Sequence, residues 1–169
     1  MNIFLLRHGI AVEAGTGAFN KDSERTLTPK GERKLWQVAD AIAALEISFG
    51  VILTSPYVRA RQTAEIIGEA LDAKKKLETS EDLTPGGSAK KLIDYINSLK
   101  PAPENVLLVG HEPFMSEFVS LLISGDSHGA SVLMKKGGLC KLTVERALQH
   151  GRCATLEWLL TPKQMALMA

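Results

Sequence analysis

Arg7, His8 and Gly9 directly follow a short apolar run at residues 2–6. A run of this length that is rich in Ile, Phe and Leu predicts a buried β-strand. The end of that strand would carry a cation and an imidazole, and Gly9 would let the backbone turn sharply or let a ligand come close. Because ligands bind at the carboxyl ends of strands in open α/β sheets, we take this group as the candidate reaction centre.

Two further apolar runs end in residues of the same chemical types. The run at 51–53 leads into Ser55 and, four residues later, Arg59, and the run at 105–109 leads into Gly110 and His111. If the three runs form neighbouring parallel strands, their ends bring two arginines and two histidines into one pocket.

Arg59 follows a predicted helix start at Ser55-Pro56. Free N–H groups at a helix N-terminus attract anions, and an arginine fork beside them suits a phosphate. Arg61 faces elsewhere and serves as an internal comparison. Arg25 lies in a loop just before another capped helix. Its side chain could equally be a solvated charge or a ligand contact.

The other histidines and the cysteines carry no comparable signal. His128 and His150 lie in predicted turns, where we expect them to be solvated and inert. Cys140 and Cys153 form no metal-type cluster, so we expect free thiols in a reducing, cytoplasmic setting. We expect no metal site, because two arginines beside two histidines would repel a cation.

The bulk composition predicts one globular domain over residues 1–169. The chain is 45% hydrophobic and 23% charged, which is ordinary for a folded domain. Its formal net charge of +1 argues against a surface for nucleic acid or an anionic membrane. No stretch approaches the ~20 apolar residues that span a bilayer, and the N-terminus lacks the features of a signal peptide.

Helical and strand patterns alternate for the first two thirds of the chain, after a loop over residues 10–28. We predict helices over residues 29–47, 55–71, 88–99 and 113–124, with a short one from 162. We predict strands over residues 2–6, 51–54, 76–79, 105–109, 131–134, 139–144 and 154–159. This order favours a mixed, mostly parallel sheet with helices on both faces.

Four motifs in this order resemble the histidine phosphatase superfamily, whose fold is also called phosphoglycerate-mutase-like. They are Leu6-Arg7-His8-Gly9, Leu27-Thr28-Pro29-Lys30-Gly31, Ser55-Pro56-Tyr57-Val58-Arg59-Ala60-Arg61-Gln62-Thr63-Ala64 and Val109-Gly110-His111-Glu112-Pro113. The resemblance implies a three-layer α/β/α sandwich. The short length and the segment at 82–87 are similar to the SixA branch, which acts on phosphohistidine and lacks a long lid insertion.

The resemblance also implies roles for individual residues. His8 would be the nucleophile of a metal-independent phosphatase without a cofactor, and Arg7, Arg59 and His111 would hold the phosphoryl group. Further candidates are Arg25, Gly9 and Ser55 as substrate contacts and Glu81 and Asp82 as possible general acids. The implied partner is a histidine-phosphorylated phosphotransfer domain or phosphocarrier protein.

Chemistry at the leaving group separates the alternatives. An ester phosphate leaves as an alkoxide and needs a general acid, whereas the imidazole of phosphohistidine departs more easily. Glu81 and Asp82 are the only nearby acids that the sequence offers, which favours phosphohistidine. The alternatives are a small-molecule phosphomonoesterase using the same His8, a mutase, and a non-catalytic phosphate-binding domain.

Overall fold

The computed structural model describes residues 1–17 and 19–168. The strands are β1 (Asn2–Arg7), β2 (Val51–Thr54), β3 (Leu77–Thr79), β4 (Asn105–Gly110), β5 (Leu139–Val144) and β6 (Ala154–Leu160). The helices are α1 (Pro29–Ala44), α2 (Val58–Ala70), α3 (Ala89–Ser98), α4 (Phe114–Ser124) and α5 (Pro162–Met165). None of the described helices is long and apolar enough to cross a membrane.

All six strands form one mixed sheet in the order β3-β2-β4-β1-β5-β6. The first four in this order run parallel, whereas β5 and β6 join antiparallel at the β1 side. The parallel part comes from strand–helix alternation and the antiparallel part from the β-rich tail, as predicted.

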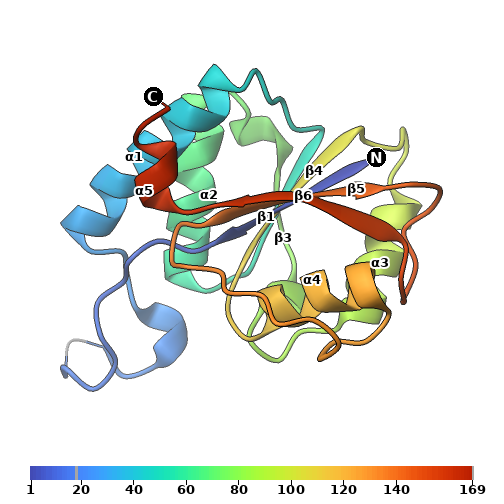
Figure 1. Cartoon of the computed structure of the whole chain (residues 1–169). Helices are drawn as coiled ribbons and strands as arrows, with labels where there is room; N and C mark the ends of the chain where they lie inside the picture. The colour runs from blue at the N-terminus through green and yellow to red at the C-terminus, as the bar shows by residue number, and fades with distance from the viewer. Residues whose placement is uncertain (18, 169) are drawn as a thin grey trace.

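The sheet is covered on both faces, as Figure 1 shows. Alternating residues of β1 point to opposite sides: Ile3 and Leu5 join the core beneath α3 and α4, and Phe4 and Leu6 join the core beneath α1, α2 and α5. Burial on both faces explains why the central strands are apolar throughout. The predicted three-layer α/β/α sandwich is confirmed, and no long lid insertion occurs among the described residues.

The carboxyl ends of β1, β2 and β4 meet at one edge of the sheet. In the register, Arg7 lies opposite Gly110 and Thr54 lies opposite Val109. Backbone hydrogen bonds extend this alignment past the strands, since the N–H of His8 donates to the oxygen of Gly110 at 3.1 Å. The predicted convergence of the three strand ends is therefore present.

Two predicted helix starts are confirmed and one is wrong. The side chain of Thr28 accepts the N–H of Gly31 at the start of α1, and Ser88 caps α3 in the same way. Helix α2 begins at Val58 rather than at the predicted Ser55-Pro56. Ser55 does not cap it, because its hydroxyl oxygen instead lies 2.9 Å from a ring nitrogen of His111.

The strand predicted at residues 131–134 is also wrong, since this segment lies outside the sheet. Both sides of β1 are already paired, with β4 and β5, so the sheet offers no position beside it. The segment instead passes the end of β1, where the backbone oxygen of Met134 accepts a hydrogen bond from Nη1 of Arg7 at 2.8 Å. Helix α1 ends at Ala44, slightly earlier than predicted.

Candidate active site

His8 is held in a single tautomer at the end of β1. Its Nε2 lies 3.2 Å from Nε of Arg59, and because the arginine nitrogen can only donate, Nε2 must accept. The proton is therefore on Nδ1, which donates to the backbone oxygen of Gly9 at 2.7 Å. The side chain is only 5% exposed. The unprotonated Nε2 of His8 thus faces Arg59 and carries the lone pair that a nucleophile needs.

The electrostatic environment keeps His8 neutral. Burial is the largest cause that lowers its pKa, and the neighbouring His111, Arg59 and Arg7 lower it further, to about 3 despite the opposing hydrogen bond to Gly9. Desolvation contributes more to this shift than either arginine. At neutral pH Nε2 therefore carries no proton, and its lone pair accepts the hydrogen bond from Arg59.

Arg59 connects His8 with the loop that precedes α1. It lies in the first turn of α2 and is 3% exposed. Besides its contact with His8, it donates from Nη1 to the backbone oxygen of Asp22 at 2.6 Å and from Nη2 to Oδ2 of Asp22 at 2.9 Å. The guanidinium therefore has a fixed position beside Nε2 of His8, a pre-organisation of the kind that phosphoryl transfer requires.

His111 presents one ring nitrogen without a protein partner. Its Nε2 lies 2.9 Å from the Ser55 hydroxyl, which accepts the N–H of Tyr57 and has no other acceptor among the described residues. The hydroxyl hydrogen is therefore directed to Nε2, so Nδ1 carries the ring proton. Burial, followed by the charge of Arg59, lowers the pKa of His111 to about 3, and its ring centroid lies 4.9 Å from that of His8.

Arg7, like His111, has a buried N–H donor without a hydrogen-bond partner among the described residues. Its Nη1 donates to Met134, whereas its Nε is buried without a hydrogen-bond partner in the described part of the chain, as is Nδ1 of His111. Burial lowers the pKa of Arg7, and the charge of Glu112 opposes that shift. Buried N–H groups without partners are costly, and an anionic oxygen would satisfy both of these donors.

Gly9 and Ser55 lie next to the histidines and help to position them. The N–H of Gly9 donates to the Thr63 hydroxyl at 3.1 Å, and a side-chain carbon at Gly9 would lie 2.6 Å from Cδ1 of Leu35. Ser55 is fully buried and its hydroxyl contacts His111. Gly9 and Ser55 therefore contact the two histidines and the core.

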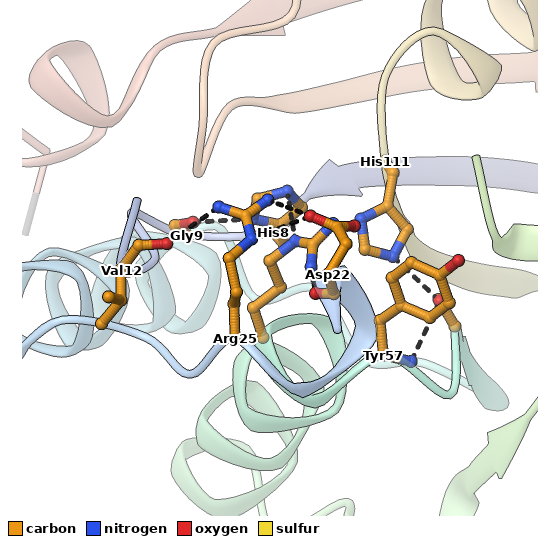
Figure 2. A network of polar contacts seen from close by, with 9 residues as sticks. His8, Gly9, Val12, Asp22, Arg25, Tyr57 and His111 are labelled. Atoms are coloured by element: carbon orange, nitrogen blue, oxygen red, sulfur yellow. Dashed lines mark hydrogen bonds and ion pairs between the residues drawn. The ribbon is translucent and has the colours of Figure 1, made fainter. Parts of the chain in front are cut away.

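Asp22 is the site residue that the sequence reasoning missed. It accepts hydrogen bonds from Arg59 and also from Nε of Arg25 at 2.8 Å, so Arg25 reaches the site through Asp22. Arg25 is held in turn by the backbone oxygen of Val12 at 2.8 Å (Figure 2). The only signal in the sequence is the spacing of three residues between Asp22 and Arg25, which is common in solvated turns.

Glu81 and Asp82 are not joined to the site. They lie in a short 3-10 helix, Glu81–Leu83, after β3, and Glu81 is exposed. Within the described residues, their carboxylates make no hydrogen bond or ion pair with either histidine or either arginine. No group of three or more His, Cys, Asp or Glu side chains that could hold a metal occurs in the same part of the chain.

Comparison with known proteins agrees with this geometry. A family model described as histidine phosphatase superfamily (branch 1) matches residues 3–84. A phosphohistidine phosphatase SixA homolog of Haemophilus influenzae is 38% identical over 130 residues, which cover 72% of this chain and 77% of that protein. Phosphohistidine phosphatase SixA of Escherichia coli is 30% identical over 129 residues, or 75% and 77% of the two chains. The chain belongs to the histidine phosphatase superfamily.

Within this superfamily the chain is of the SixA type and is a phosphatase, that is, a hydrolase. A solved structure of the protein histidine phosphatase SixA complexed with tungstate superimposes with a TM-score of 0.83 at 26% identity, covering 96% of this chain and 98% of that one. A Klebsiella pneumoniae protein whose name is probable phosphoglycerate mutase GpmB is 39% identical, but this similarity covers only 41% of the present chain. The similarity to SixA therefore spans more of the fold.

Proposed function

We propose that this SixA-type phosphatase removes the phosphoryl group from phosphohistidine in a phosphotransfer domain or phosphocarrier protein. The observation that carries the proposal is the neutral His8 with its unprotonated Nε2, together with two N–H donors, Nε of Arg7 and Nδ1 of His111, that are buried without a hydrogen-bond partner among the described residues. The SixA relatives named above are named for the same reaction. Such a substrate implies a role in signal transduction or phosphotransfer in the cytoplasm.

The first step transfers the phosphoryl group to the enzyme. The lone pair on Nε2 of His8 attacks phosphorus in line with the leaving nitrogen, so a new N–P bond forms as the substrate's N–P bond breaks. Arg59, Arg7 and the Nδ1–H of His111 stabilise the charge on the equatorial oxygens. The Gly9 carbonyl accepts the Nδ1–H of His8 and stabilises the positive charge that develops on its ring.

The second step hydrolyses phospho-His8. Water attacks phosphorus from the side that the leaving group has vacated, and the electron pair of the N–P bond returns to Nε2. Inorganic phosphate carries away the oxygen and both protons of the water molecule as dihydrogen phosphate, and His8 returns to its neutral form with the proton on Nδ1. The same donors serve both steps, because both pass through the same trigonal arrangement of oxygens.

Phosphohistidine fits this site better than a phosphate ester. An alkyl ester needs a proton for its leaving oxygen, and the two acids considered from the sequence, Glu81 and Asp82, make no contact with the histidines. The matches to phosphoglycerate mutase-type proteins keep a small-molecule phosphatase as the second candidate. It would use the same His8 and a different source of the proton.

Phosphate release from a histidine-phosphorylated phosphocarrier protein and from an aryl phosphate tests the proposal. We expect wild type to favour the carrier and His8→Asn to lose turnover by at least about 10³-fold, because the variant lacks the nucleophile. His128→Asn, which changes an exposed histidine, is the matched control and should behave as wild type.

Two outcomes would contradict this function. Rapid ester hydrolysis with little release from the carrier would favour the small-molecule phosphatase. Release that survives in His8→Asn would show that another group attacks phosphorus.

A further inference from the structure

Asp22 is an anionic side chain fixed beside the cationic side chains of Arg25 and Arg59. Its side chain is 50% exposed, yet one carboxylate oxygen accepts from Arg59 at 2.9 Å and the other lies 2.6 Å from Nη2 of Arg25. Figure 2 shows it between Arg25 and His111. This carboxylate is therefore held in place where the group of charged side chains is exposed to solvent.

The carboxylate and the nucleophile are bound to the same guanidinium. Nε of Arg59 contacts Nε2 of His8, and Nη2 of Arg59 contacts Oδ2 of Asp22. Because a guanidinium is planar and rigid, Asp22 keeps a constant distance from His8. A phosphoryl group bound at Nε2 would place its leaving group toward the solvent side, where Asp22 lies.

Asp22 is ionised in this environment. Burial raises the pKa of its carboxyl group, but the hydrogen bonds from Arg59 and Arg25 outweigh that cause and the pKa is lowered overall. An ionised carboxylate accepts hydrogen bonds and has no proton to give to a leaving oxygen. It thus cannot serve as the general acid that an ester requires.

We propose that Asp22 is a specificity-determining residue that accepts a hydrogen bond from the second ring nitrogen of a protonated phosphoimidazole. The role rests on the proposed function and names the leaving group that this site selects. Phosphohistidine carries phosphorus on one ring nitrogen and can carry a proton on the other. A carboxylate at this position favours this cationic form of the substrate.

The reaction then needs no proton transfer to the leaving group. As the bond between Nε2 of His8 and phosphorus forms, the substrate's N–P bond breaks and its electron pair returns to the ring nitrogen. The proton stays on the other ring nitrogen, and a neutral imidazole departs. An alkyl ester would leave as an oxyanion beside the anionic Asp22, which disfavours it.

The test compares three substrates: a histidine-phosphorylated phosphocarrier protein, free phosphohistidine, and 4-nitrophenyl phosphate, whose leaving group needs no proton. For Asp22→Asn we expect the ratio of kcat/KM on either phosphohistidine substrate to that on 4-nitrophenyl phosphate to fall on the order of 10- to 100-fold. Asp22→Glu should restore most of the ratio. Glu24→Gln, an exposed carboxylate two residues away, should keep the wild-type ratio.

Other outcomes would overturn the role of Asp22. An equal loss on all three substrates would mean that Asp22 only orders Arg59, and an unchanged ratio would mean that it does not contact the leaving group. A loss confined to the carrier would mean that Asp22 contacts the protein surface instead. Wild type without turnover on either phosphohistidine substrate would instead overturn the proposed function itself.

Discussion

Each reactive side chain in this pocket is positioned by a neighbour that fixes one of its hydrogen bonds. Gly9 holds the protonated nitrogen of His8, and Ser55 holds one nitrogen of His111. The two rings lie close together, with centroids 4.9 Å apart, and Arg59 contacts the remaining nitrogen of His8. The site therefore combines a neutral imidazole with cationic donors, an arrangement that would be unstable if the histidine carried a charge.

Arg59→Ala should lower kcat/KM for phosphohistidine by about 10²- to 10³-fold, equivalent to ~3–4 kcal/mol of transition-state stabilisation. The reason is that, among the described residues, Arg59 is the one that hydrogen-bonds to both His8 and Asp22. Steady-state kinetics should be measured beside Arg61→Ala, which removes an exposed arginine from the same helix. Equal effects of the two variants would show that the loss reflects net charge rather than position.

At the scale of elements, the site depends on how closely the segment after β1 approaches α1 and α2. The N–H of Leu27 donates to Oε1 of Gln62 at 2.8 Å, which attaches the chain before α1 to α2. At the start of α1, a side-chain carbon at Gly31 would lie 2.1 Å from the backbone oxygen of Ile10, next to Gly9. Only glycine permits this approach, so α1 helps to set the position of the strand end that carries His8.

Gly31→Ala should therefore lower the free energy of unfolding by at least about 1–3 kcal/mol, although alanine is the better helix former. A backbone oxygen cannot move aside as a flexible side chain can, so the two segments must separate. Urea denaturation is the measurement, with Gly86→Ala as the control because no atom lies within 4 Å of the added carbon there. A Gly31→Ala variant as stable as wild type would contradict the close approach.

At the scale of the whole molecule, the two buried histidines couple stability to pH. The pKa of each is lowered from 6.5 to about 3 by burial, so the unfolded chain binds protons that the folded chain does not. Stability should therefore fall as the pH drops from about 6.5 toward about 3, by about 2 kcal/mol per histidine between pH 6.5 and 4.5. Asp22, whose pKa is lowered, adds its loss only at more acidic pH.

Urea denaturation between pH 7.5 and 4.5 measures this dependence. The double variant His8→Asn/His111→Asn should show a clearly weaker fall, because it lacks both groups. Wild-type stability that stays constant over this range, or a fall of the same size in the double variant, would show that the histidines are not held neutral.

The sequence by itself determined most of the fold, because the signals involved are local. A mixed sheet with helices on both faces was predicted from the apolar runs, from the Thr28 and Ser88 caps and from the alternation of strands and helices. The placement of Arg7, His8, Arg59 and His111 after strand ends or near a helix start also predicted their convergence. Two predictions from ambiguous local signals were wrong. The hydroxyl of Ser55 contacts His111 and does not begin α2. Residues 131–134 form no strand, because both sides of β1 are already paired.

Only the tertiary structure decided which groups complete the site. Asp22 reaches Arg59 across 37 residues of sequence, and no pattern of composition or spacing encodes that contact. The protonated nitrogen of each reactive histidine likewise depends on which hydrogen-bond donors and acceptors the folded chain brings to its ring. Residue types and their order thus determine which chemical groups are available. The path of the loop before α1 determines that the carboxylate of Asp22 contacts Arg59.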